Sequence, residues 1–143
     1  MMNKKKITVV VETGKDLFSC FVAGTDSIGT GIIGDGKTAR EAMADFKACY
    51  QEAREDSIAR GEALPDVEFD FVLDVGAFLD YYPLNVSAFA KYIGENPSQL
   101  RRYASGLSQP SAKTIERIRK GFDTLAHDIV EGRLVDRPVL QYV

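Results

Sequence analysis

The chain has little of the chemistry on which many small enzymes and secreted proteins depend, since it contains only two cysteines and one histidine. Two cysteines are too few for a disulfide scaffold, and Cys20 and Cys49 lack the spacing of a metal site. We expect both thiols to be small core residues. The histidine, His127, has no cysteine or serine nucleophile near it in the sequence, which favours a surface or capping role.

Long apolar runs and paired carboxylates are also missing. The run from Ile7 to Val11 after the basic start is too short for a signal-peptide core, and no stretch approaches the length of a membrane span. No two carboxylates have a spacing that a helix or strand would turn into an acid–base couple. With 45% hydrophobic and 27% charged residues, the composition is typical of a soluble globular protein. We expect a cytoplasmic protein that is not an enzyme and holds no cofactor or metal.

The clearest functional signal lies between Leu84 and Phe122, where the pattern predicts three helices with tight joints. Asn85 is a good cap for a first helix, and Gly94 supplies its left-handed end. Asn96 then caps a second helix that has Pro97 at its first position, where the missing N–H costs nothing. Two helix starts and one stop so close together predict a helix-turn-helix.

The second predicted helix has one buried side and one polar side. Leu100 and Tyr103 lie one turn apart on the buried side, and Gly106 ends the helix. The outward residues are Ser98, Gln99, Arg101, Arg102 and Ser105. Ser111 then caps a third helix with one apolar stripe. The residues of this stripe are Ala112, Ile115, Ile118 and Phe122.

This order of helices, caps and glycines resembles the phage-repressor-like (Cro/XRE) DNA-binding family. The residues that carry the resemblance are Ala90, Gly94, Leu100, Tyr103, Gly106, Pro110, Ser111, Thr114 and Ile118. In that family the second helix enters the major groove, and flanking turns contact phosphates. The resemblance implies base contacts by Ser98, Gln99 and Arg102. It implies phosphate or backbone contacts by Asn85, Ser87, Ser108, Gln109 and Lys113. Arg101, on the same outward face, completes the predicted DNA-binding set.

Charge supports this interpretation. Between Leu84 and Phe122 seven basic residues stand against two acidic ones, a balance of +5, whereas the whole chain has a net charge of −3. A basic island in an acidic protein is typical of a surface that neutralises phosphates. The alternative is that these side chains only solvate the outer faces of a three-helix bundle. Proline at a helix start, glycine at both stops and an exposed polar turn together favour DNA binding.

The first half of the chain predicts a different architecture. Strands are expected at residues 7–11, 17–23 and 28–33, followed by a helix from Thr38 to Gly61 that opens with the capping box Thr38-Ala39-Arg40-Glu41. A half-buried strand follows from Val67 to Leu73 or Val75. The expected order is therefore β-β-β-α-β.

That order, with the motif GDGKTAREA over residues 34–42, resembles the N-terminal domain of HicB-type antitoxins. Their pattern is a three-stranded meander, then Gly-Asp and a helix that begins Thr-x-x-Glu-Ala. Many members carry Asp-Leu-Pro-Gly after the second strand, where this chain has Ala23-Gly24-Thr25-Asp26-Ser27. HicB-type proteins commonly append a helix-turn-helix or ribbon-helix-helix module. The resemblance implies a partial RNase H-like domain that binds and blocks a small basic, mRNA-cleaving toxin of HicA type.

We therefore expect an α+β protein with two domains and a tail. Residues 1–75 form the β-β-β-α-β toxin-binding domain, residues 76–132 the all-α helix-turn-helix domain with a short first helix from Gly76 to Pro83, and residues 133–143 a tail, an edge strand or a dimer arm. The charge divides at the same joint, at −5 through Val75 and +2 beyond it. The predicted function is a type II antitoxin that neutralises a HicA-like toxin and represses its own operon by binding operator double-stranded DNA as a homodimer or higher homo-oligomer.

Three alternatives remain open at this stage. The chain could be a stand-alone transcriptional regulator whose N-terminal domain dimerises or senses a ligand. The chain could also be a small nucleotide-binding enzyme, because residues 31–38 fit the phosphate-loop pattern GxxxxGKT and Phe71-Val72-Leu73-Asp74 resembles the metal-holding strand that accompanies it. Against this, Ile32 and Ile33 would sooner complete a strand of their own. The acidic run Glu52, Glu55 and Asp56 is either a solvated helix face or a surface for a basic toxin.

Overall fold

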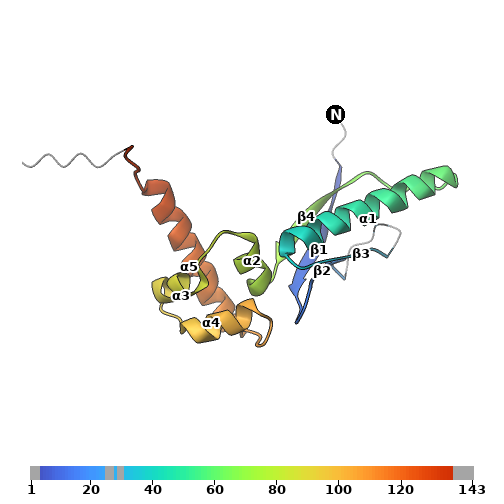
Figure 1. The fold of residues 1–143 in the computed structure, drawn as a ribbon. Coiled ribbons are helices and arrows are strands. Elements are labelled where there is room, and N and C mark those ends of the chain that lie inside the picture. Colours follow the sequence, from blue (N-terminus) through green and yellow to red (C-terminus); the bar gives the residue numbers. More distant parts are fainter. Residues whose placement is uncertain (1–3, 25–27, 29–30, 137–143) are drawn as a thin grey trace, which may run out of the picture. The chain divides into compact units, whose positions relative to one another are not determined.

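The computed structural model describes residues 4–24, 28 and 31–136. Its elements follow the order β1-β2-β3-α1-β4-α2-α3-α4-α5 (Figure 1). The predicted mixture of a β-sheet and helices is confirmed. The chain divides into two compact units, residues 1–109 and residues 110–143. Among the described residues, every helix is too short or too polar to cross a lipid bilayer.

The four strands form one sheet in the order β3-β2-β1-β4. β1 (Lys5–Thr13) pairs antiparallel with β2 (Phe18–Val22), and β3 (Ile33–Gly36) pairs antiparallel with the other edge of β2. β4 (Val67–Leu73) is parallel to β1, a pairing that requires a long crossover connection. The helix α1 supplies that crossover.

α1 (Ala39–Ala59) begins at the predicted capping box. The Thr38 hydroxyl accepts a hydrogen bond from the Glu41 backbone N–H at 3.0 Å. The Glu41 carboxylate in turn accepts from the Lys37 N–H at 3.0 Å, one residue upstream of the usual donor. Two N–H groups at the start of the helix are thereby satisfied, and α1 lies along one face of the sheet (Figure 1).

The core of the first unit lies between α1 and this face of the sheet. The Phe46 side chain is fully buried, and its ring meets that of Phe69 edge-on with centroids 5.0 Å apart. Gly34 lets the helix approach β3, because a Cβ there would lie 2.5 Å from the Phe46 backbone nitrogen. The other buried members of this core are Ile7, Val9, Val11, Cys20, Ile28, Ala39, Ala42, Tyr50 and Ala77.

α2 (Val75–Tyr81) is the short helix that the sequence predicts between the two halves. Its Ala77 is fully buried in the core of the sheet and α1. The Asp80 carboxylate accepts a hydrogen bond from the Ala39 N–H at 2.8 Å and so helps to cap α1. α2 also packs against α4 (Pro97–Ala104). The helix therefore contributes to both halves, and the domain boundary after residue 75 stays a prediction.

The third strand lies further along the chain than predicted. A strand was expected over residues 28–33, but β3 covers Ile33–Gly36, while residues 29–30 are outside the described part. Gly34 pairs with Cys20 at the point where α1 approaches most closely. Glycine is depleted in strands, so propensity cannot reveal a strand whose glycine is required by packing against a helix.

Residues 31–38 do not have the geometry of a phosphate loop. Ile33–Gly36 lies in an antiparallel edge strand, and the Thr38 hydroxyl is occupied as the cap of α1. A phosphate loop instead leaves the end of a buried parallel strand and turns its backbone N–H groups toward the ligand. The structural context that the motif requires is therefore absent from these residues.

Candidate nucleic-acid interface

α3 (Val86–Ile93) begins and ends at the predicted residues. The Asn85 side-chain oxygen accepts from the backbone N–H three residues on at 2.9 Å. Gly94 has the left-handed φ of 74° that favours glycine at a helix end. The Glu95 N–H donates to the Ala90 carbonyl at 2.8 Å, a bond typical of a Schellman ending. The chain turns sharply here because these bonds satisfy the last carbonyls of the helix.

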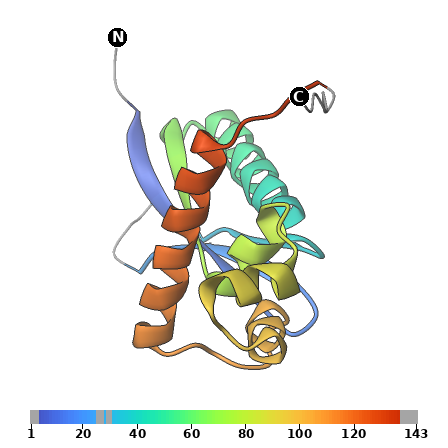
Figure 2. The ribbon, with the colours of Figure 1, turned by 90° about the vertical axis from the view of Figure 1, so that its left-hand side faces the viewer.

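α4 follows directly after the turn formed by residues 94–96 (Figure 2). Its cap is Asn96, whose side-chain oxygen accepts from a backbone N–H at 3.2 Å, and Pro97 occupies the first helical position. Leu100 is fully buried as predicted, whereas Tyr103 is half-buried. The predicted pair of capped helices joined by a tight turn is confirmed.

The turn after α4 lies close to the turn between β1 and β2 within the first unit. Gly106 has a φ of 77°, and a Cβ at this position would lie 3.1 Å from the Gly14 carbonyl oxygen. Gly14 belongs to the turn between β1 and β2, which its N–H closes by donating to the Leu17 carbonyl at 2.9 Å. The backbone after α4 therefore passes close to this turn, where a side chain at position 106 would be crowded.

α5 (Ala112–Glu131) belongs to the second unit. Ser111 is its cap, as predicted, with the hydroxyl accepting from the Thr114 N–H at 3.2 Å. Ile118 and Gly121 are buried, and Lys113 is exposed on the first turn. The described residues of the predicted tail, 133–136, form no helix or strand, and residues 137–143 lie outside the described part of the chain.

Arg101 connects α3 to α4. Its Nη1 donates to the Ser87 hydroxyl at 2.6 Å, and its Nη2 donates to the Ser98 hydroxyl at 3.2 Å. Three predicted DNA-binding residues thus form one hydrogen-bonded group. Because hydroxyl acceptors carry no negative charge, these two hydrogen bonds do not neutralise the positive charge of the guanidinium.

A second contact brings Arg102 and Ser108 together. The Arg102 Nε donates to the Ser108 hydroxyl at 3.0 Å, which connects the predicted base reader to a predicted phosphate contact in the turn after α4. Both arginine side chains are exposed. The two guanidinium groups therefore give the exposed side of α4 a local positive charge.

The remaining predicted residues have different environments. Gln99 is half-buried on the first turn of α4, and Gln109 is exposed at the end of the first unit. The Asn85 oxygen is occupied as a helix cap, which limits it to contacts through its amide nitrogen and backbone. Lys113 lies in the second unit. Sequence reasoning missed the bonds between each arginine and its serines, because only the folded turn brings Ser87 beside Arg101.

The two cysteines differ in burial. Cys20 is fully buried, as predicted, and burial together with the Asp35 and Asp45 carboxylates raises its pKa to about 11. Cys49 is only half-buried, so the prediction that it is a core residue is wrong. Its Sγ lies on the side of α1 that carries the exposed Asp45, 3.9 Å from Asp45 Oδ1. Burial and then the Asp45 carboxylate raise the pKa of Cys49 as well.

The other side chains that the sequence singles out are exposed. The exposed His127 ring lies 3.4 Å from the Glu131 carboxylate, which confirms the predicted surface position. Within the described ranges, no group of three or more histidine, cysteine or acidic side chains is arranged to hold a metal ion. Glu52, Glu55 and Asp56 are exposed on α1.

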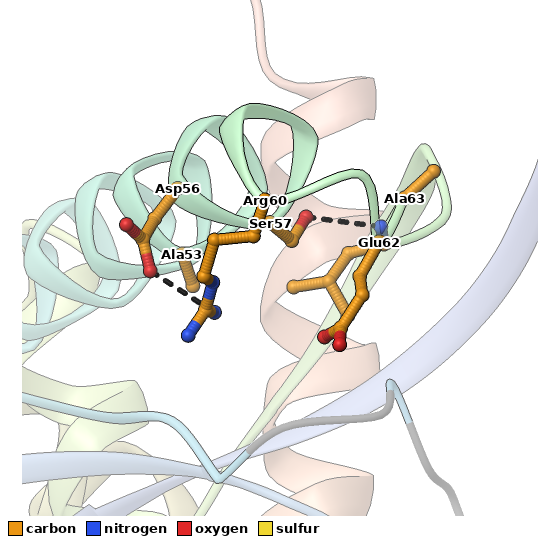
Figure 3. A pocket seen from close by; sticks show the side chains of 7 residues that line it. Ala53, Asp56, Ser57, Arg60, Glu62 and Ala63 are labelled. Carbon is orange, nitrogen blue, oxygen red and sulfur yellow. Dashed lines mark hydrogen bonds and ion pairs between the residues drawn. The ribbon is translucent and has the colours of Figure 1, made fainter.

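A pocket of about 230 Å³ lies at the end of α1 (Figure 3). Its charged groups Asp56 and Arg60 form an ion pair at 3.0 Å, and the Ser57 hydroxyl accepts from the Leu64 N–H at 3.1 Å. These polar groups stabilise the turn that ends the helix. The third charged side chain that lines the pocket, Glu62, is exposed.

Comparison with known proteins gives no relative from which to transfer a function. No family model, curated protein or solved structure matches the chain.

Proposed function

We propose that this protein is a DNA-binding antitoxin of HicB-like type, which neutralises a small basic mRNA-cleaving toxin of HicA type and represses its own operon. In this proposal the first half of the chain binds the toxin, and the α3-turn-α4 segment binds operator DNA. The protein itself performs no catalysis and needs no cofactor or metal.

The observation that carries the DNA-binding part is the geometry of α3 and α4. Two short capped helices meet at a tight turn, and the exposed side of the second helix presents Arg101 and Arg102. A helix of this kind fits the major groove, where guanidinium groups bind guanine edges or phosphates. Their serine partners Ser98 and Ser108 hold them near the helix, which lowers the entropy lost on binding.

Operator binding by this class of module requires a dimer. Helix-turn-helix repressors bind two half-sites about one helical turn apart, so the protein symmetry must match a near-palindromic DNA site. α5 offers apolar surface for self-association, since Ile129 is 66% and Val130 83% exposed. We therefore propose a homodimer or a higher homo-oligomer that dimerises in part through the end of α5.

The antitoxin part rests on the resemblance of the first half and on its acidity. Residues 1–75 carry fourteen acidic and nine basic side chains. A toxin that cleaves mRNA needs a basic surface for phosphates, and an acidic protein competes for that surface. DNA and RNA are polyanions, so they lack this charge complementarity to the acidic first half. The proposal therefore assigns DNA binding to the second half.

Two binding measurements test the proposal. The purified chain is titrated by fluorescence anisotropy with duplex DNA from upstream of its own gene and with a scrambled duplex of equal length. It is also co-purified with the product of a short adjoining reading frame that encodes a basic protein with a candidate catalytic histidine. An antitoxin binds the upstream duplex preferentially and retains the basic protein. Binding of DNA alone indicates a stand-alone regulator, and binding of neither contradicts the proposal.

A further inference from the structure

The face of the sheet opposite α1 carries an apolar row that crosses all four strands. On β1, the residues alternating with Val10 point into the core under α1. Val10 pairs with Phe21 on one side and with Val72 on the other, and Phe21 pairs with Ile33. Because paired residues lie on the same face of a sheet, these four side chains form a continuous cross-strand row.

This cross-strand row is open to solvent at both ends. Ile33 is 66% and Val72 is 42% exposed, while Phe21 and Val10 between them are half-buried. A sheet with one covered face normally alternates apolar residues on that face with polar residues on the other. Four apolar side chains in register on the solvent face break this alternation. Such a patch marks a surface that another molecule covers.

Acidic residues flank the cross-strand row on both sides. Glu12, Ser19 and Asp35 pair across three strands beside it, and the Ser19 hydroxyl donates to the Asp35 carboxylate at 2.8 Å. On the other side Thr8 pairs with Asp70. The next pair outward is Lys6 with Glu68. The face therefore has an apolar centre and a rim with four carboxylates and one lysine, the usual anatomy of a protein interface.

The rim charge identifies the class of partner. Carboxylates around an apolar centre repel nucleic-acid phosphates and anionic lipid headgroups. A second copy packed on the same face would set carboxylates against carboxylates, at a cost in association free energy. A protein with cationic groups around an apolar contact complements both parts of the surface. We propose that this sheet face is the docking surface for a small basic protein, which is the toxin if the proposed function holds.

The outer face of α1 is the competing acidic surface and supplies matched controls. There the Asp56 carboxylate is paired with Arg60 at 3.0 Å, and the Glu55 carboxylate accepts from the Gln51 amide at 3.1 Å. These carboxylates are already partly compensated. The helix also exposes Ile58, at 57%. Isoleucine and acidic residues thus occur on both surfaces, at similar exposure.

The test uses the full chain and the purified product of the adjoining reading frame, made as an inactive variant. Isothermal titration calorimetry compares Ile33→Asp and Asp70→Lys on the sheet face with Ile58→Asp and Glu52→Lys on α1. We expect each sheet-face variant to weaken binding by about tenfold or more, and each α1 variant by less than about threefold. Circular dichroism melting establishes that every variant is folded. Val72→Asp replaces Ile33→Asp if the latter fails to fold.

The outcomes separate this inference from the proposed function. If the unaltered chain binds the basic protein and the sheet-face variants bind equally well, the docking surface is wrong while the antitoxin function stands. Loss of binding in the α1 variants alone assigns the toxin to α1 and also overturns the inference. If the unaltered chain does not bind, the antitoxin function is contradicted and the docking surface falls with it.

Discussion

The Asp74 carboxylate accepts two hydrogen bonds from Thr13, one from its hydroxyl at 2.6 Å and one from its backbone N–H at 2.8 Å. These bonds join the end of β1 to the residue that follows β4. The same carboxylate caps α2 by accepting from the Ala77 N–H at 2.8 Å. One side chain therefore connects the sheet to the helix that leads into α3 and α4, and both of its oxygens are occupied.

Replacement of Asp74 should destabilise the protein more than its partial exposure suggests. Asp74→Ala removes the cap of α2. It also leaves the hydroxyl and the backbone N–H of the buried Thr13 without their acceptor. We expect a loss of roughly 2–4 kcal/mol in the free energy of unfolding. Urea denaturation followed by circular dichroism measures it.

The control for this change is Glu52→Ala, which removes an exposed carboxylate from α1 and should alter stability by no more than about 0.5 kcal/mol. Asp74→Asn keeps an acceptor oxygen for the cap and should have an intermediate effect. If Asp74→Ala is as stable as the Glu52 control, the junction does not depend on this carboxylate.

The buried thiol predicts a loss of stability at high pH. Burial, with smaller contributions from Asp35 and Asp45, raises the pKa of Cys20 from 9 to about 11. The unfolded chain therefore releases this proton at a lower pH than the folded chain. The stabilisation is fully present below pH 9 and is lost as the pH rises toward 11, by roughly 2–3 kcal/mol.

Urea denaturation of the unaltered chain and of Cys20→Ala, at a series of pH values between 8 and 11, checks the direction of this change in stability. The variant is less stable throughout because it lacks a buried sulfur, but its stability should decline less with pH. All other ionisable groups are common to both proteins and cancel in the comparison. Parallel pH profiles would show that the thiol does not ionise with the assigned shift.

The helices were more predictable than the sheet, for reasons that particular residues make clear. Asn85, Asn96 and Ser111 act within four residues of their own position, so their caps are readable from local sequence. The predicted limits of β3 are wrong because the true limits depend on the close approach of Gly34 to Phe46, which lies on a different element. Strand pairing is likewise non-local, and no periodicity within one strand indicates which partner residue lies opposite.

The candidate DNA-binding residues divide in the same way. Exposure of Arg101 and Arg102 follows from helical periodicity around the buried Leu100. Their hydrogen bonds to Ser87 and Ser108 cannot be derived from this periodicity, because they depend on how the chain turns before and after α4. The cross-strand row could not be predicted from the sequence either, since Val10 and Ile33 become neighbours of Phe21 only through the register of three strands.

A base-reading role for Arg102 makes a specific prediction for DNA binding. Arg102→Ala should cost roughly 1–3 kcal/mol in binding free energy on the operator and relax the preference at one base position. Competition anisotropy against single-base variants of the upstream duplex resolves the two effects. Arg60→Ala serves as the control and should leave both unchanged, because it removes an exposed arginine at the end of α1, outside the predicted DNA-binding set. Unchanged specificity in Arg102→Ala would assign base reading to another residue.

A phosphate contact by Lys113 predicts a different signature. Lys113→Ala should weaken binding to operator and scrambled duplexes alike, and the slope of log K against log salt should become shallower by about one unit. Anisotropy titrations at several salt concentrations give this slope. Lys47→Ala, on the exposed side of α1, removes the same charge outside the predicted interface and should leave the slope unchanged. A sequence-dependent loss would instead make Lys113 a base reader.

The last prediction concerns where the proposed toxin-binding half of the chain ends. A fragment of residues 1–75 lacks α2, so it loses the buried Ala77 and the carboxylate of Asp80 that accepts from the Ala39 N–H at 2.8 Å. It also loses the Tyr81 ring, over which the Arg40 guanidinium lies at 4.2 Å from the centroid. A fragment of residues 1–83 keeps all three contacts and ends after α2.

We expect the longer fragment to be more stable than the shorter one by roughly 2–4 kcal/mol, since burial of one small side chain, a charged hydrogen bond and a cation–π contact are regained together. Circular dichroism melting compares the two. Co-expression with the adjoining basic protein, scored by growth, then tests function: residues 1–83 should protect cells without repressing the promoter, because α3 and α4 are absent. Equal melting of both fragments would place the boundary before α2, and protection by residues 84–143 alone would assign the toxin to the other half.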